Sequence, residues 1–283
     1  MGRVVALLVA VMIGILTVSA NLAAGTRGEA AVNPLEPMAG AVTDLLNGAD
    51  RLAPDLARSV ENNLNFDNSM LNGALLKKLP TNEILTDGDL AGLEAPGANY
   101  TGAEVSRTRF VGALLDEASF DLATGDDPDF SKTRLALASF VRATLPRADF
   151  SKSDLRSVRA ERAAFENASF RGADITGGAF SEARLKGADF SSAYIAHGWF
   201  NRVKADGAEF NGADLRAANF QSADLTGAVF TGADISYARF TGAVLKGADF
   251  TVALGAATAW FEGACGDETT KAPDGVMIAD CKD

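Results

Sequence analysis

Residues 208–237 read AEFNG ADLRA ANFQS ADLTG AVFTG ADISY, a run in which one pattern returns every five residues. In each unit a small residue, usually Ala, comes two positions before a large apolar one, and polar or small residues follow. A period of five fits neither an α-helix, with about 3.6 residues per turn, nor a β-strand, whose side chains alternate. It fits a solenoid whose wall turns a corner every five residues, so that four units close one coil.

The large apolar residues test the length of this coil. Between residues 110 and 250 they fall, with few exceptions, on multiples of five, and Phe alternates with Leu or Ile. A coil of twenty residues places each residue above the one twenty earlier. Two opposite faces then carry Phe and the other two carry Leu or Ile. With alanines at the corners, such a core fills a narrow square cross-section at the density of a protein interior.

The exceptions keep the same register. Ala160 stands where a Phe is expected, and Phe165 occupies the adjacent Leu position, so the volume lost on one face is restored on the next. Ala205 and Gly125 also interrupt the pattern. The segment around Gly125, residues 121–128, is the best place in the repeat for a local bulge, although the spacing resumes unshifted after it.

Three successive units open with Ala, then Asp or Asn, then Leu or Phe: Ala213-Asp214-Leu215, Ala218-Asn219-Phe220 and Ala223-Asp224-Leu225. The pattern, kept over residues 98–251, resembles the pentapeptide-repeat family, whose motif is written A-(D/N)-L-x-x. The resemblance implies an all-β solenoid, the right-handed quadrilateral β-helix. It does not imply one activity, because the family includes DNA-mimicking topoisomerase protectors and many proteins of unknown role. We expect the β-helix to occupy residues 86–255.

The chain begins with features of an export signal. One basic residue, Arg3, precedes an apolar run over residues 4–18, and the small residues Ser19-Ala20 follow. This is the layout of a secretory signal peptide cleaved before Asn21. An uncleaved anchor over residues 4–24 is the alternative, since about 20 apolar residues can span a bilayer. We therefore expect residues 1–20 to be a signal peptide or membrane anchor and the protein to be extracytoplasmic, periplasmic or secreted.

Residues 21–85 carry no five-residue signal until the last few. Their apolar residues step by three and four, as on one face of an amphipathic helix: Val42, Leu45, Ala49, Leu52 and Leu56. We expect a short helical N-terminal cap here, because the end of a solenoid exposes strand edges and apolar core. A helix for self-association or for a partner is the alternative.

The tail, residues 256–283, holds both cysteines of the chain. Cys265 and Cys281 flank the turn sequence Pro273-Asp274-Gly275. In an oxidising compartment we expect them to form a disulfide, which for a loop of this size stabilises by about 3 kcal/mol. Two cysteines without a nearby His supply too few ligands for a metal site.

Charge bears on the function. The chain carries 26 basic and 37 acidic residues, a net charge of −11, but residues 98–255 hold 18 basic and 20 acidic ones. A DNA mimic needs its negative charge along the repeat, and here most of it lies at the ends. The register predicts acidic rows on two adjacent faces: Asp129, Asp149, Asp189, Glu209 and Asp249 on one, and Asp154, Asp174, Asp214 and Asp234 on the next. It predicts a basic row opposite: Arg142, Arg159, Arg162, Arg202 and Arg239. A simpler role for each Asp is to bond nearby backbone donors.

Catalytic signals are weak. His197 is the single histidine, with no motif around it, and the glycines recur as corner residues rather than in a phosphate-binding loop. We expect no enzyme activity, no cofactor and no metal.

One segment has an unusual surface. Residues 193–200 place Tyr194, His197 and Trp199 at outward positions that elsewhere hold small or polar residues. Stacking by twenty brings Tyr237 and Arg239 two coils above His197 and Trp199. These five residues form our candidate binding site, because Trp, Tyr and Arg most often anchor interfaces. A few exposed rings beside the small Ala205 are the plainer interpretation.

We therefore expect a non-enzymatic exported scaffold that presents flat faces for protein–protein interaction in the cell envelope. The protein partner is unknown, nucleic acid is not expected to bind, and the membrane is contacted only through the N-terminal segment. The alternative is a DNA-mimicking protector or inhibitor of a type II topoisomerase.

Overall fold

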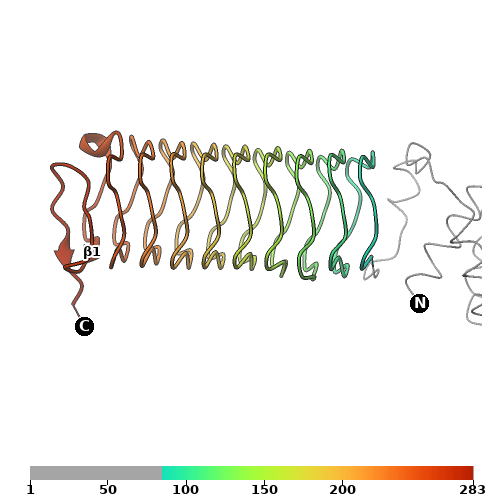
Figure 1. Cartoon of the computed structure of the whole chain (residues 1–283), viewed down its shortest axis with the longest axis horizontal. Helices are drawn as coiled ribbons and strands as arrows, with labels where there is room; N and C mark the ends of the chain where they lie inside the picture. Colours follow the sequence, from blue (N-terminus) through green and yellow to red (C-terminus); the bar gives the residue numbers. More distant parts are fainter. Residues whose placement is uncertain (1–84, 283) are drawn as a thin grey trace, which may run out of the picture. The chain divides into compact units, whose positions relative to one another are not determined.

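The computed structural model describes residues 85–282, which belong to one compact unit, Asn72–Asp283. The predicted signal segment and all but the last residue of the predicted helical cap lie outside the described residues. Within them the chain winds into successive coils stacked along one axis (Figure 1). Regular elements are short: the 3-10 helix η3 (Ala256–Thr258) and the strands β1 (Cys265–Gly266) and β2 (Ala279–Asp280), which pair in parallel. No described helix is long and apolar enough to cross a membrane.

The coils are held together by four ladders of parallel β-bridges. From Asp89 to Leu254 each bridge joins a residue to the one twenty later, for example Asp189 to Glu209 and Trp199 to Asn219. Because the chain turns a corner every five residues, each face contributes one bridged residue per coil rather than a longer strand. The coil of twenty residues and the four-sided β-helix predicted from the sequence are confirmed.

The corners are tight turns. The N–H of Ala113 donates to the carbonyl of Phe110 at 2.9 Å, and Gly112 between them has φ of 68°. A positive φ at the third residue of a turn is the type II requirement, which glycine meets without steric cost. The chain also places larger residues at this position, among them Arg142 at 58° and Tyr237 at 59°. Each such residue costs about 1–2 kcal/mol, which the surrounding core must offset.

The core consists of stacked rings. Phe110 and Phe130, on one face, are parallel with centroids 4.7 Å apart, whereas Phe110 and Phe120, on opposite faces, meet edge-to-face at 5.6 Å. Both are favoured ring geometries. The phenylalanines at multiples of ten from 110 to 240, apart from residue 160, are buried to 1% exposure or less. Burying each ring stabilises the fold by about 1.5–3 kcal/mol.

The predicted compensation between Ala160 and Phe165 is confirmed. Both residues are buried, and the Phe165 ring lies 6.1 Å from that of Phe140 and 6.3 Å from that of Phe180. Phe140 and Phe180 are the rings below and above Ala160 on its own face. Phe165 therefore reaches across the core and fills the gap in that stack.

The bulge expected in residues 121–128 is wrong. The bridges Glu104–Thr124 and Arg109–Asp129 both span twenty residues, so no extra residue enters the coil. The reason is the missing side chain of Gly125: a Cβ there would lie 2.6 Å from the backbone nitrogen of Ser106. Glycine therefore lets the backbone lie close to that of the preceding coil, and the register is kept.

The ladders continue past residue 255, but the last bridges span more than twenty residues. Arg239 pairs with Trp260 and Asp249 with Lys271, which are spacings of 21 and 22. The ring of Phe261 stacks on Phe240 at 4.9 Å, so the core also extends into this last coil. Its outer edge is covered, because β2 pairs with β1 and a disulfide joins Cys265 to Cys281. The predicted disulfide is thus present in the structure.

Candidate functional site: an aromatic and cationic patch

One ladder carries most of the candidate site. Its bridged residues, here called the Trp199 ladder, are Asn99, Ser119, Ser139, Arg159, Ala179, Trp199, Asn219, Arg239 and Trp260. Trp199 and Arg239 therefore lie on one face with Asn219 between them, as the spacing of twenty predicts. Trp199 is 54% exposed, on a surface whose neighbouring positions are small or polar.

His197 and Tyr237 lie at the corner that leads into this face. Both occupy the turn position with positive φ, at 61° and 59°, and both are exposed. The Tyr237 N–H donates to the Thr258 hydroxyl oxygen at 3.1 Å, in place of the backbone carbonyl used in regular coils. The structure thus brings four of the five predicted residues to one corner and face.

Tyr194, the fifth predicted residue, is placed differently. It is 57% exposed, but it belongs to the neighbouring ladder, where it is bridged to Asp174 and Asp214. It faces acidic neighbours rather than the Trp199 ladder.

Trp260 completes the patch and was not predicted. Its ring lies 5.2 Å from the guanidinium carbon of Arg239 and 6.5 Å from the ring of Tyr237. Counting by twenty pointed to Ala259, because η3 adds one residue to this coil. The dipeptide Trp260-Phe261, which repeats the order of Trp199-Phe200, was the available signal. We call Trp199, Tyr237, Arg239, Trp260 and His197 the aromatic patch.

The arrangement suits binding rather than proton transfer. A guanidinium over an indole ring contributes about 0.5–1 kcal/mol at an exposed site, and both groups keep free edges for a partner. Asp214, a carboxylate within electrostatic reach of His197, is held by Arg216, whose Nε donates to Oδ1 at 2.8 Å. This hydrogen bond keeps the pKa of Asp214 below its usual range. In the described residues no group of three His, Cys, Asp or Glu side chains could hold a metal ion.

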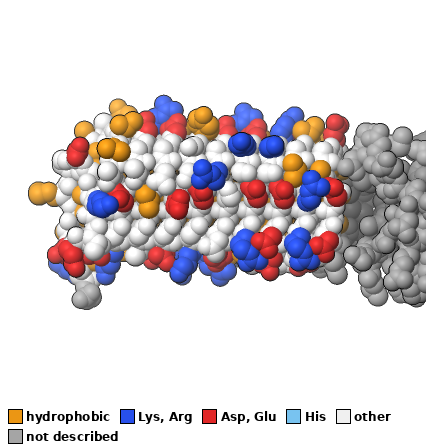
Figure 2. All heavy atoms as spheres, viewed as in Figure 1, with side chains coloured by type: hydrophobic (Ala, Val, Ile, Leu, Met, Phe, Trp, Pro, Cys, Tyr) orange, Lys and Arg blue, Asp and Glu red, His pale blue; other side chains and the backbone are white. Residues whose placement is uncertain are grey.

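The acidic rows are largely engaged with local donors. The Asp129 carboxylate accepts the N–H of Ser131 at 2.9 Å, and that of Asp189 accepts the N–H of Ser191 at 2.8 Å. Asp189 also pairs with Arg171 at 2.9 Å. Figure 2 shows acidic and basic side chains interspersed along the face in view, with scattered hydrophobic ones. The predicted rows exist in the ladders, but their carboxylates stabilise turns and pair with adjacent cations.

Comparisons with known proteins agree with this fold. The family model described as pentapeptide repeats matches in eight copies, over residues 127–159, 153–191, 168–204, 200–232 and 208–247. A solved structure of QnrB1, a plasmid-mediated fluoroquinolone resistance protein, is 18% identical with a TM-score of 0.54. That match covers 66% of this chain and 91% of QnrB1. HetL, a pentapeptide repeat protein of the cyanobacterium Nostoc sp., is 26% identical with a TM-score of 0.23, covering 68% of this chain and 90% of HetL. A comparison with curated proteins gave no match.

Proposed function

Residues 127–247 belong to the pentapeptide-repeat family, and on that premise we propose that this protein is a non-enzymatic, exported scaffold that binds a protein partner in the cell envelope. The observation that carries the proposal is the aromatic patch. Trp199 and Tyr237 are more than half exposed, and Arg239 and Trp260 lie beside Tyr237. Clusters of Trp, Tyr and Arg are the groups that most often anchor protein interfaces.

The cysteines support the exported part of the proposal. Disulfides persist in oxidising compartments and are rare in reducing ones. The bond between Cys265 and Cys281 joins the last coil to the segment after β2. The apolar run over residues 4–18 supports the same compartment. Mass spectrometry of the protein from its host tests this directly: cleavage gives a mature N-terminus near Asn21, and an intact N-terminus indicates the anchor over residues 4–24.

The binding role is tested by removing the rings of the patch. We expect the double variant Trp199→Ser, Tyr237→Ser to keep its melting temperature and to lose the envelope partner that the wild type captures. Leu137→Ser is the matched control, because Leu137 is an exposed residue at the same corner, three coils before His197. A double variant that retains every partner of the wild type contradicts the proposal.

Topoisomerase protection by DNA mimicry is the second candidate. The fold shared with QnrB1 favours it, and the charges oppose it, because a mimic needs carboxylates presented along the groove of its target. Here the carboxylates of Asp129 and Asp189 bond adjacent backbone donors. A gyrase supercoiling assay separates the two candidates: the scaffold leaves the reaction unchanged, and a mimic inhibits it or protects it from quinolones.

A further inference from the structure

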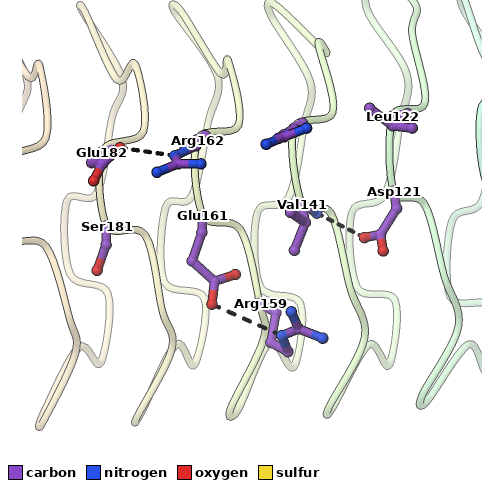
Figure 3. A pocket seen from close by; sticks show the side chains of 9 residues that line it. Asp121, Leu122, Val141, Arg159, Glu161, Arg162, Ser181 and Glu182 are labelled. Carbon is purple, nitrogen blue, oxygen red and sulfur yellow. Dashed lines mark hydrogen bonds and ion pairs between the residues drawn. The ribbon is translucent and has the colours of Figure 1, made fainter.

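A shallow groove lies along the corner that follows the Trp199 ladder, nearer the start of the described coils. Arg159, a member of the Trp199 ladder, lies at one side of the groove, and the other lining residues occupy the turn positions at that corner. The groove has a volume of about 460 Å³ and crosses four successive coils. Figure 3 shows Leu122, Arg162 and Glu182 in one row along it, with Val141 and Glu161 in the row beside it.

Two charged groups in the groove can still bind a ligand. Arg142 is the one arginine of the described residues whose guanidinium makes no hydrogen bond, ion pair or ring contact. Glu161 lies beside it: its Oε1 atom is 3.9 Å from Arg159, its Oε2 atom accepts no hydrogen bond from the described residues, and its side chain is 35% exposed. An unpaired guanidinium is available to an anion, and the exposed part of the Glu161 carboxylate is available to a donor. One ligand that offers an acceptor and a donor would satisfy both.

The groove also has an apolar end. Leu122 is 54% exposed and adopts φ of 60°, a strained conformation at which most other corners of the chain place glycine or a polar residue. Val141 lies in the adjacent coil and lines the same groove. Together they give an apolar surface next to the free guanidinium of Arg142.

The charges of the groove select against a polyanion. Arg162 donates to Glu182 at 2.8 Å and holds the pKa of Glu182 below its usual range, so Glu182 is ionised beside the arginines. A phosphate or sulfate chain would meet this carboxylate and that of Glu161 along the groove. An extended peptide meets both signs, because its backbone alternates N–H donors and C=O acceptors and its side chains can differ in charge.

We propose that this groove binds an extended segment of the partner protein, with an acidic side chain seated on Arg142 and a backbone N–H donated to Glu161. The proposal rests on the scaffold function and adds the class of ligand and a second contact point. It places the segment along the axis of the coils, at the corner that borders the face of the Trp199 ladder.

The spacing of the coils specifies the order of side chains. Coils stacked at about 4.8 Å put Glu182 about 14 Å from Leu122 along the axis. The midpoint between Arg142 and Arg162 then lies about 7 Å from Leu122. Alternate side chains of an extended peptide lie about 6.6 Å apart on one face. An apolar, an acidic and a basic residue at positions one, three and five therefore reach Leu122, the arginine pair and Glu182.

The test uses blocked peptides of the sequence Leu-Ser-Glu-Ser-Lys and its reverse, since the direction of the segment is open. Isothermal titration calorimetry with the purified protein should show one of them binding at millimolar concentration. Replacing the peptide Glu with Lys, or Arg142→Gln in the protein, should weaken binding about tenfold or more. Lys152→Gln is the matched control, because Lys152 has the same turn conformation at another corner, with φ of 57°.

Absence of binding by both peptides, or binding that Arg142→Gln leaves unchanged, overturns the proposal. Equal binding of the Lys-substituted peptide does so too. The double variant of Trp199 and Tyr237 should bind the peptide as the wild type does. If that variant loses the envelope partner and neither peptide binds the protein, the groove is rejected and the scaffold function is kept. If the variant keeps the envelope partner and a peptide binds, the scaffold function alone is rejected.

Discussion

The guanidinium carbon of Arg239 lies 5.2 Å from the centre of the Trp260 ring, although 21 residues separate them in a wall whose coils contain twenty. The extra residue is taken up by η3, which ends just before the ladder resumes. The contact shows that the wall keeps its ladder of bridges when the chain between two bridges grows longer. The bridges between successive coils are therefore kept even where the number of residues in a coil changes.

This relationship predicts the effect of shortening η3. Deleting Ala257 gives the last coil its regular twenty residues, with Trp260 still at the bridge and Phe261 still facing inward. The N–H of Tyr237, now bonded to the Thr258 hydroxyl, would regain a backbone acceptor as Ala217 has in Ser236. We expect the free energy of unfolding to change by less than about 1 kcal/mol. A melting curve checks this, and loss of the cooperative transition would contradict it.

The buried rings cannot accept a charge. Phe210 is fully buried between Phe190 and Phe230, at centroid distances of 5.0 and 4.9 Å. Phe210→Asp removes both stacks and buries a carboxylate without a partner, so we expect a loss of about 4 kcal/mol or more. Far-UV circular dichroism and thermal melting measure it. Gln221→Asp, at an exposed position, should melt like the wild type, and an equal loss in both variants would argue against the register.

The pair Ala160 and Phe165 should be energetically coupled. Phe165→Leu alone leaves a cavity, and Ala160→Phe alone overfills a layer that the Phe165 ring already occupies. Each single variant should lose about 1–3 kcal/mol. The double variant restores the regular alternation and should lose less than the sum by about 1 kcal/mol or more. A double-mutant cycle in urea measures the coupling, and additive losses would mean that the two sites do not share the space.

The last coil should respond to acid at one contact. Lys271 Nζ donates to Asp249 Oδ2 at 2.7 Å and Thr251 donates to Oδ1, which lowers the pKa of Asp249 from 3.8 to about 2. A carboxyl whose pKa is lowered by folding contributes its full stabilisation when the pH is above its pKa in the unfolded chain. This contribution is lost as the pH falls from 3.8 towards 2. The amide proton shift of Thr251 should therefore titrate with a midpoint near 2. A midpoint near 3.8, or the same titration in Asp249→Asn, would show that the contact is not formed.

Reduction of the disulfide should act locally. Cys265 and Cys281 tie the segment after β2 to the last coil, while the ladders before Leu254 do not involve it. We expect reductant to speed amide exchange in residues 255–282 and to leave exchange around Phe210 unchanged. Hydrogen-exchange mass spectrometry resolves the two regions. Faster exchange throughout the coils would mean that the bridge supports the whole wall.

The sequence predicts the core because the closed square wall leaves few choices for a large side chain. A ring at a multiple of five must point inward, and the space it fills is shared across the layer. That is why the pattern of residues alone identifies Phe165 as compensation for Ala160. The same argument places Trp199 and Arg239 on one face, because each comes directly before a buried Phe and the two are two coils of twenty residues apart.

The failures come from backbone adjustments that a count of residues does not contain. Gly125 keeps the register by lying close to the backbone of Val105 and Ser106, so that the expected bulge does not form. The 3-10 helix η3 absorbs an added residue and brings Trp260 to Arg239. The repeat pattern places the charged residues in rows but does not predict which of them are paired. Whether Arg142 is free, or Asp214 is held by Arg216, depends on side chain geometry that no repeat pattern specifies.

The constant spacing of the coils fixes the distance along the axis between any two sites on the surface. Trp199 stands two coils beyond Arg159 in one ladder, and the groove and the aromatic patch keep a fixed sideways offset, because every coil turns through four corners and returns to the same face. Duplication of a twenty-residue block between them would lengthen their separation along the axis by about 4.8 Å and leave the sideways offset unchanged. A lineage can thus adjust the distance between two contact points to a partner of different length by gene duplication alone, without redesigning either contact.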